Sequence, residues 1–284
     1  MSDDERETDA EIASKQYPYL TRRRALAAGG VALGTTVFGG STLASSHGNG
    51  DDESGGEGDE SGGEGDAGHE YRVTVTNLTS GQPFTPPAVA LHQPSVEVFS
   101  VGDPANEPVQ QIAENGNLDP LVSLIESTSA IRAAGVGEAP LVPSADPGGT
   151  GNPYYTTLTI AADESATHLT FISMLIGTND GFVGLDTVEL PEEVNESKTL
   201  HANGYDAGTE QNTERFADMV PPAQALIQGG EDDAGTTESN PDIAEDAVIR
   251  PHPGITGGAD LDPATYGWDE PAASVHVEKI AGDE

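Results

Sequence analysis

Short runs of alternating apolar and polar residues, separated by loops rich in Gly, Pro and Asn, constrain the fold most strongly. In residues 71–76, Tyr and Val alternate with Arg and Thr, a pattern typical of a strand with one buried face. Residues 109–128 have apolar positions at helical spacing, but Gly116 and Pro120 interrupt them, which predicts two short helices. The chain is therefore predicted to be all-β, an antiparallel β-sandwich with one or two short helices and long acidic loops. Further strands are predicted at residues 96–101, 154–161, 167–177, 181–190, 197–205 and 274–281.

The charge of the chain indicates the solvent in which it works. It has 49 acidic and 11 basic residues, a formal net charge of −38, and no cysteine. Such a charge normally favours disorder or self-repulsion, yet the predicted strands are too apolar for a disordered chain. At an ionic strength of about 1 M the Debye length is only about 3 Å, so surface carboxylates hardly repel one another. The composition thus indicates a halophilic protein.

The same composition excludes several classes of function. No cluster of basic residues is present to neutralise phosphates, which excludes nucleic acid as a partner. The absence of cysteine excludes disulfides, thiol catalysis and thiolate metal ligands. No motif joins a nucleophile to a base, and the seven histidines are scattered without a zinc-type spacing. We therefore expect a protein that is not an enzyme.

The N-terminal region is predicted to direct export. Arg22, Arg23 and Arg24 precede a weakly apolar, Gly- and Ala-rich run that ends near Ala44. Residues 1–44 are therefore predicted to be a cleavable twin-arginine-type signal peptide, with an uncleaved anchor as the alternative. Residues 45–70 repeat Gly, Ser, Glu and Asp and are predicted to be a flexible linker before a single domain at 71–284. We expect a secreted or cell-surface protein with no stable membrane insertion after cleavage.

Two loops carry the residues that could bind a hard cation. Asp206 and Glu210 flank Gly208 in the segment Tyr-Asp-Ala-Gly-Thr-Glu, and Asp180 follows the strand predicted at 167–177. Calcium takes six to eight oxygen ligands, and loops supply both carboxylates and backbone carbonyls. Loops at one end of a sandwich converge, so the two segments could meet. In so acidic a chain, an ordinary acidic turn is the alternative.

The order of the motifs from Tyr71 to about Ala281 resembles the spondin domain family. The resemblance is carried mainly by TNDGFVGLD at 178–186 followed by YDAGTE at 205–210, and ends with HPGITGGADLD and WDEPAASVHVEKI. It implies a β-sandwich similar to C2 domains, with Ca²⁺ bound at one end by Asp180, Asp206 and Glu210. Glu210 stands where the animal proteins carry aspartate. Their cysteines and thrombospondin-type repeats are absent, so their matrix and neuronal roles are not carried over.

We therefore expect a calcium-binding, spondin-like domain with an adhesion or binding role toward an unknown extracellular or cell-surface ligand, either a protein or a glycan. A secreted calcium-dependent hydrolase and a structural cell-envelope protein are the alternatives. Asn77 and Asn195 each begin a glycosylation sequon, although Asn77 could instead cap a turn at the end of its strand.

Overall fold

The computed structural model describes residues 36–39, 68–230 and 235–282. Most of the predicted signal peptide and linker therefore lies outside the described residues. The exceptions are residues 68–70 of the linker and strand β1 (Thr36–Gly39), which falls within the predicted signal peptide and pairs antiparallel with β4 (Ile131–Val136).

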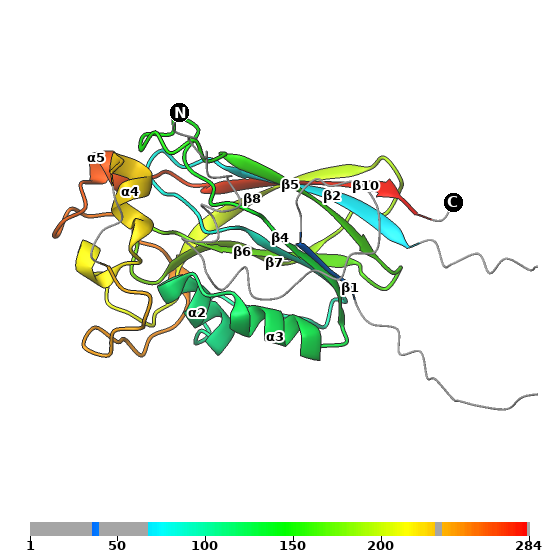
Figure 1. The fold of residues 1–284 in the computed structure, drawn as a ribbon. Helices are drawn as coiled ribbons and strands as arrows, with labels where there is room; N and C mark the ends of the chain where they lie inside the picture. Colours follow the sequence, from blue (N-terminus) through cyan, green and yellow to red (C-terminus); the bar gives the residue numbers. More distant parts are fainter. Residues whose placement is uncertain (1–35, 40–67, 231–234, 283–284) are drawn as a thin grey trace, which may run out of the picture.

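The strands form two antiparallel layers that share one strand (Figure 1). In β8 (Ser197–Asp206), residues 197–202 pair with β10 and residues 203–206 pair with β7. The path β1-β4-β3-β6-β7-β8-β10-β2-β5 is thus continuous, and the predicted antiparallel sandwich is confirmed, in a nearly closed form. The likeness to C2 domains stays a prediction. The other strands are β2 (His69–Asn77), β3 (Ala88–His92), β5 (Tyr155–Ala162), β6 (His168–Met174), β7 (Gly181–Glu189), β9 (Arg250–Pro251) and β10 (Ala273–Ala281).

One hydrophobic core lies between the two layers. The alternation in β2 places Val73 and Val75 in this core at 0% exposure, where they pack with Leu158 and Ile160 of β5. Arg72, Thr74 and Thr76 alternate with them and are exposed or half-buried. Half-buried strands with period-two patterning were therefore predicted reliably, because one face of each strand is dry and the other is wet.

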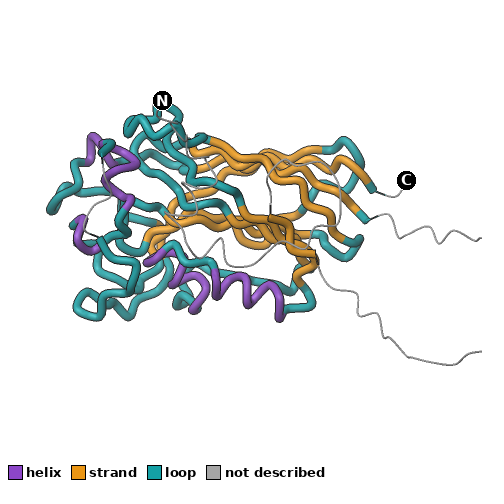
Figure 2. Tube along the Cα trace, in the orientation of Figure 1, coloured by secondary structure: helices purple, strands orange, loops and turns teal. Residues whose placement is uncertain are grey.

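A second core lies on the outer face of the layer that contains β6. Helices α2 (Glu107–Asn115) and α3 (Asp119–Ser127) cover this face (Figures 1 and 2). Ile112 of α2 packs in one cluster with Ile172 and Met174 of β6. Because β6 is covered on both faces, its residues are buried almost without interruption rather than in alternation.

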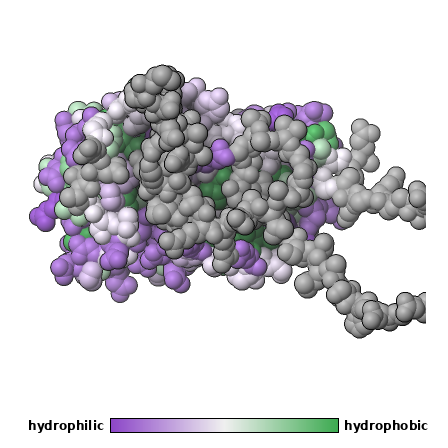
Figure 3. All heavy atoms as spheres, viewed as in Figure 1, coloured by the Kyte–Doolittle hydropathy of each residue, from purple (hydrophilic) through white to green (hydrophobic). Residues whose placement is uncertain are grey.

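The two predicted helices are confirmed, and their ends follow from the residues there. Asn106 caps α2 by accepting a hydrogen bond from the Val109 N–H at 3.0 Å, and Gly116 ends the helix with φ 62°. Hydrophilic residues make up most of the outer surface along the lower edge of Figure 3, where these helices lie. No helix of the described residues is long and apolar enough to cross a membrane.

The prediction of a strand at residues 96–101 is wrong. This segment is irregular, because side chains of β7 satisfy its backbone in place of a neighbouring strand. The Val98 N–H donates to Asp186 Oδ1 at 3.0 Å, and Thr187 Oγ1 donates to the Val96 carbonyl at 2.8 Å. Its apolar side chains, Val96, Val98 and Phe99, enter the second core.

The described residues of the acidic segment 221–265 contain short elements. They include α4 (Pro222–Gln228), β9 and α5 (Pro263–Tyr266), and the 3₁₀ turn η1 (Phe216–Asp218) precedes them. These elements gather at the end of the sandwich where β7 begins and β8 ends (Figure 1). The candidate site lies at this end.

Candidate functional site

A tight turn between β6 and β7 places Asp180. Thr178 Oγ1 donates to the Leu175 carbonyl at 2.6 Å and accepts from the Gly181 N–H at 2.9 Å. A side chain at Gly181 would collide with Thr178, so the turn requires glycine there. Asp180 is consequently held immediately before the first residue of β7.

The strand register brings Asp206 beside Asp180. Gly181 is paired with Asp206, the last residue of β8, and the Ala207 N–H donates to the Asp180 carbonyl at 3.0 Å. Gly208 then adopts φ +72°, and a Cβ there would lie 2.8 Å from backbone atoms of the neighbouring segment. The chain can therefore curl after β8.

Asp180 is buried with only one of its carboxylate oxygens satisfied. Its Oδ2 accepts hydrogen bonds from the Thr209 and Glu210 N–H groups, at 2.8 and 3.0 Å, and from Thr209 Oγ1. Its Oδ1 is buried without a partner, and the residue is 0% exposed. Burial, and then the charge of Asp206, raise the pKa of Asp180 to about 6. The ionised form is therefore disfavoured in the protein alone.

Asp206 is equally buried, but both of its carboxylate oxygens accept hydrogen bonds. Its Oδ1 accepts from the Gly208 N–H at 2.9 Å, and its Oδ2 accepts from Asn212 Nδ2 at 2.7 Å and from Arg250 Nη2 at 3.1 Å. Asp180 and Asp206 together thus present two buried carboxylates, of which only Asp206 is paired with a guanidinium.

Glu210 contributes its main chain to this pair, while its carboxylate has another partner. Its Oε1 accepts from the Asn240 N–H at 3.0 Å. Burial raises the pKa of Glu210 to about 7, with further contributions from Glu114, Asp180 and Asp218. Across the described residues, no group of three or more His, Asp or Glu side chains is arranged to hold a metal ion. Two of the three predicted ligands are thus brought together, and the third carboxylate is engaged nearby.

The chemistry of the Asp180–Asp206 pair fits a hard cation. Carboxylate oxygens are the ligands that calcium prefers, and a buried oxygen without a donor is costly unless something compensates it. Among the described residues, no basic side chain forms an ion pair with Asp180. A cation beside Oδ1 would satisfy that atom and relieve the repulsion between the two carboxylates.

A neighbouring carboxylate, Glu214, acts only as a structural clamp. Its Oε1 accepts from the Thr256 N–H at 2.5 Å and from Thr256 Oγ1 at 2.8 Å, and its Oε2 accepts from the Gly258 N–H at 2.5 Å. Burial opposes the charge of Glu214, but these hydrogen bonds outweigh it and lower its pKa. Glu214 thereby attaches residues 256–258 to the site loop, a role that its sequence position did not reveal.

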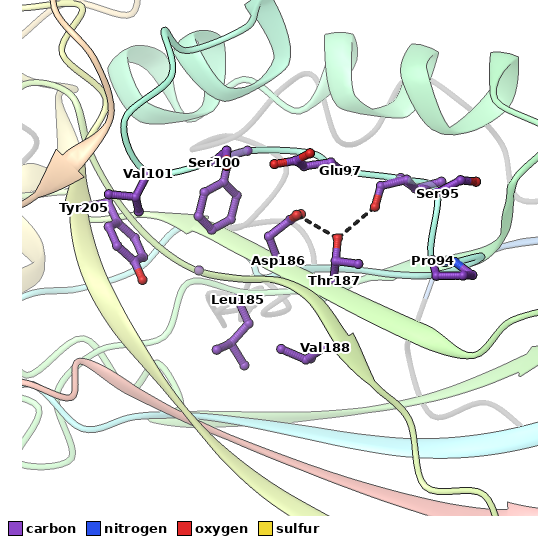
Figure 4. Close-up of a pocket in the computed structure, with 13 residues that line it drawn as sticks. Pro94, Ser95, Glu97, Ser100, Val101, Leu185, Asp186, Thr187, Val188 and Tyr205 are labelled. Carbon is purple, nitrogen blue, oxygen red and sulfur yellow. Dashed lines mark hydrogen bonds between the residues drawn. The ribbon is translucent and has the colours of Figure 1, made fainter.

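Sequence analysis also missed a cleft between residues 94–101 and β7 (Figure 4). It has a volume of about 480 Å³, and Asp186, Thr187 and Tyr205 lie on its wall. Thr187 adopts φ +52°, unusual for a β-branched residue, and donates to Asp186 Oδ2 at 2.7 Å.

Beside this cleft lies a hydrogen-bonded chain of a histidine, a threonine and an aspartate, but its order differs from that of hydrolases, in which the histidine lies between the nucleophile and the acid. Thr170 Oγ1 lies 2.9 Å from His92 Nε2 and donates to Asp186 Oδ1 at 2.9 Å. His92 and Thr170 are 0% and 2% exposed, so a substrate cannot reach the Thr170 hydroxyl. Burial lowers the pKa of His92, against the raising effects of the Gln93 carbonyl and Asp186. The chain is therefore a packing feature of the second layer.

The two sequons occupy different surroundings. Asn77 is 2% exposed, and its Nδ2 donates to the carbonyls of Gln82 and Leu141, at 2.8 and 3.0 Å. Its Oδ1 accepts from the Thr79 N–H, so Asn77 caps the turn after β2, and a glycan cannot be attached in the folded state. Asn195 is exposed in the turn before β8.

Comparison with known families identifies the class of protein. The family model Spondin_N matches residues 78–225, more than half of the 284 residues, and the chain belongs to this family of spondin N-terminal domains. The match includes Asp180, Asp206 and Glu210 and ends before Arg250. The family is of a non-catalytic binding type and is typical of extracellular proteins. No curated protein matches the chain at a significant level.

Proposed function

We propose that this protein is a secreted or cell-surface module that binds calcium at the end of the sandwich where Asp180 and Asp206 lie. The same end would adhere to an extracellular ligand. Asp180 and Asp206 would hold the ion, and Glu210 would supply the third carboxylate. The observation that carries the proposal is Asp180 Oδ1, a fully buried carboxylate oxygen without a hydrogen-bond partner beside a second buried carboxylate.

Calcium at this position would join two segments that are far apart in sequence. Asp180 belongs to the turn between β6 and β7, whereas Asp206 and Glu210 lie at and beyond the end of β8. In the absence of the ion, the Asp180 and Asp206 carboxylates repel each other, and this repulsion is included in the raised pKa of Asp180. The ion supplies the positive charge that these groups require and stiffens the loops around them.

Melting experiments at the native salt concentration test the calcium site, because screening in molar salt weakens calcium affinity. We expect chelation to lower the melting temperature of the wild type and Asp206→Ala to abolish this response. Asp246→Ala is the matched control, because Asp246 is an exposed acid of the neighbouring loop. Identical melting of wild type and Asp206→Ala with and without calcium would refute the site.

The adhesion role rests on membership of an extracellular, binding-type family. The same proposal includes export directed by the segment at Arg22, Arg23 and Arg24. It also includes function of the protein in concentrated salt. A pull-down from cell-envelope material at high salt, with and without chelator, should recover a protein or glycan only when calcium is present. Turnover of polysaccharides or esters by the pure protein would instead favour the hydrolase, and self-association in salt would favour the envelope protein.

A further inference from the structure

Arg250 forms an ion pair with Asp206 of the proposed calcium site, and the fold holds it there. It lies on β9, where the register pairs it directly with Asp206. The backbone on either side is anchored, since the Ile249 N–H donates to the Asp103 carbonyl at 2.9 Å and the His252 N–H to the Gly204 carbonyl at 3.0 Å. The backbone therefore holds Arg250 beside Asp206, while its long side chain can still change partners.

The guanidinium bridges two carboxylates with opposite surroundings. Arg250 Nη2 lies 3.1 Å from Asp206 Oδ2 and 3.0 Å from Glu245 Oε2. The Asp206 side chain is 0% exposed, whereas the side chains of Glu245 and Arg250 are 36% and 38% exposed. Arg250 can thus give up the inner partner and keep the outer one.

The net charge of the site determines how calcium and the Arg250 guanidinium affect each other's binding. Asp180, Asp206 and Arg250 together carry a net charge of −1, and a divalent cation would make that set +1. Asp206 Oδ2 already accepts from Arg250 and Asn212, which leaves little room for a third electrophile. Like charges in a site with little water repel strongly, so calcium and the guanidinium compete for Asp206.

We propose that Arg250 is a built-in competitor of calcium: it neutralises Asp206 in the metal-free protein and transfers to Glu245 when the ion binds. This inference rests on the proposed function, because it assumes that calcium binds at Asp206. Glu245 is suited to receive the guanidinium, since its main-chain N–H donates to the Thr209 carbonyl at 2.7 Å and fixes it beside the site loop. Arg250 thereby sets the calcium concentration at which the site fills.

Calorimetric titration of the full chain with calcium chloride at fixed salt tests the proposal. Arg250→Gln should raise calcium affinity about tenfold, a usual size for coupling between two linked binding events. It should also lower the melting temperature of the metal-free protein, because Asp206 loses its counter-ion. Arg72→Gln is the matched control: it removes an exposed arginine paired with Glu278 on other strands and should leave calcium affinity unchanged.

A second variant keeps the test valid if Arg250→Gln does not fold. Glu245→Gln removes the outer partner, so the guanidinium stays on Asp206 and calcium affinity should fall several-fold. This fall should exceed that of Asp246→Asn, which removes a neighbouring exposed charge without touching Arg250, and it should vanish in an Arg250→Gln background.

The possible outcomes separate the two proposals. Weaker calcium binding by Arg250→Gln would mean that the guanidinium orients Asp206 for the ion, and it would overturn the competition. Unchanged binding by both Arg250→Gln and Glu245→Gln would overturn it as well. If neither the wild type nor any variant bound calcium, the proposed function would fail, and this inference with it.

Discussion

Glu214 and Asp180 are buried carboxylates at the same end of the molecule, yet their pKa values move in opposite directions. Both oxygens of Glu214 accept hydrogen bonds from residues 256–258, and its pKa is lowered. Only one oxygen of Asp180 accepts hydrogen bonds, Asp206 lies beside it, and its pKa is raised to about 6. Burial acts in the same sense on both, so the donors and neighbouring charges decide the outcome.

This difference separates a carboxylate that completes the fold from one that the fold leaves incomplete. Glu214 has its full set of donors from the chain itself, and its charge stabilises the loop that it holds. Asp180 has donors on one side only, and no residue of the described chain compensates the other side. The two carboxylates are therefore distinguished by what the second oxygen of Asp180 lacks rather than by burial.

The largest expected effect comes from removing the clamp. Glu214→Ala should lower the free energy of unfolding by about 3 kcal/mol, because the N–H groups of Thr256 and Gly258 and the Thr256 hydroxyl lose a charged acceptor. Urea denaturation followed by fluorescence measures this, with exposed Glu164→Ala as the control. A loss below about 1 kcal/mol would show that the clamp holds a loop that contributes little to the fold.

Stability should fall as pH rises because of some carboxylates and fall as pH drops because of another. Asp180 and Glu210 have folded-state pKa values raised to about 6 and about 7, so they favour folding when protonated. Their contribution is complete below about pH 4 and is lost as pH rises to about 7. We expect the metal-free protein to lose about 2 kcal/mol over this range, since one pKa unit corresponds to about 1.4 kcal/mol and solvent reduces the effect.

Glu214 opposes this trend at lower pH. Its pKa is lowered, so its contribution is present at neutral pH and is lost as pH falls below the ordinary range of a glutamate. Thermal unfolding in chelator between pH 3 and 8 measures the sum. Added calcium should remove the decline between pH 4 and 7 and leave the acid limb unchanged. A decline that persists in saturating calcium would contradict the assignment to Asp180 and Glu210.

The fold was largely predictable where burial leaves a periodic signal. β2 and β10 alternate because one face of each packs between the layers. β3 and β4 were missed because they are rich in alanine and glycine, with weak strand propensity, and become strands through their neighbours. The strand prediction for residues 96–101 failed for the opposite reason. Their composition favours a strand, but their backbone hydrogen-bonds to side chains of β7 instead of to a neighbouring strand.

The candidate site was predictable only in part, for a similar reason. The placement of Asp180 and Asp206 follows from motifs that keep a recognisable spacing. Arg250 pairs with Asp206 from 44 residues further along the chain, on a strand of two residues that carries no periodic signal. The donors of Glu214 likewise come from a distant loop. Contacts made by irregular segments depend on tertiary packing and leave no pattern in the sequence.

The smallest expected effect distinguishes the two carboxylates most directly. Asp180→Asn removes the repulsion with Asp206 and keeps an oxygen that can accept from the Thr209 and Glu210 N–H groups. We expect the metal-free variant to be more stable than wild type by about 1 kcal/mol at pH 7, and to lose the response to calcium. Glu214→Gln, the same isosteric change on the satisfied carboxylate, should instead destabilise the protein, because its donors lose a charged acceptor. Thermal melting of both variants in chelator checks the signs. Destabilisation by both changes would mean that Asp180 is already compensated within the fold, and the difference between the two carboxylates would then need another explanation.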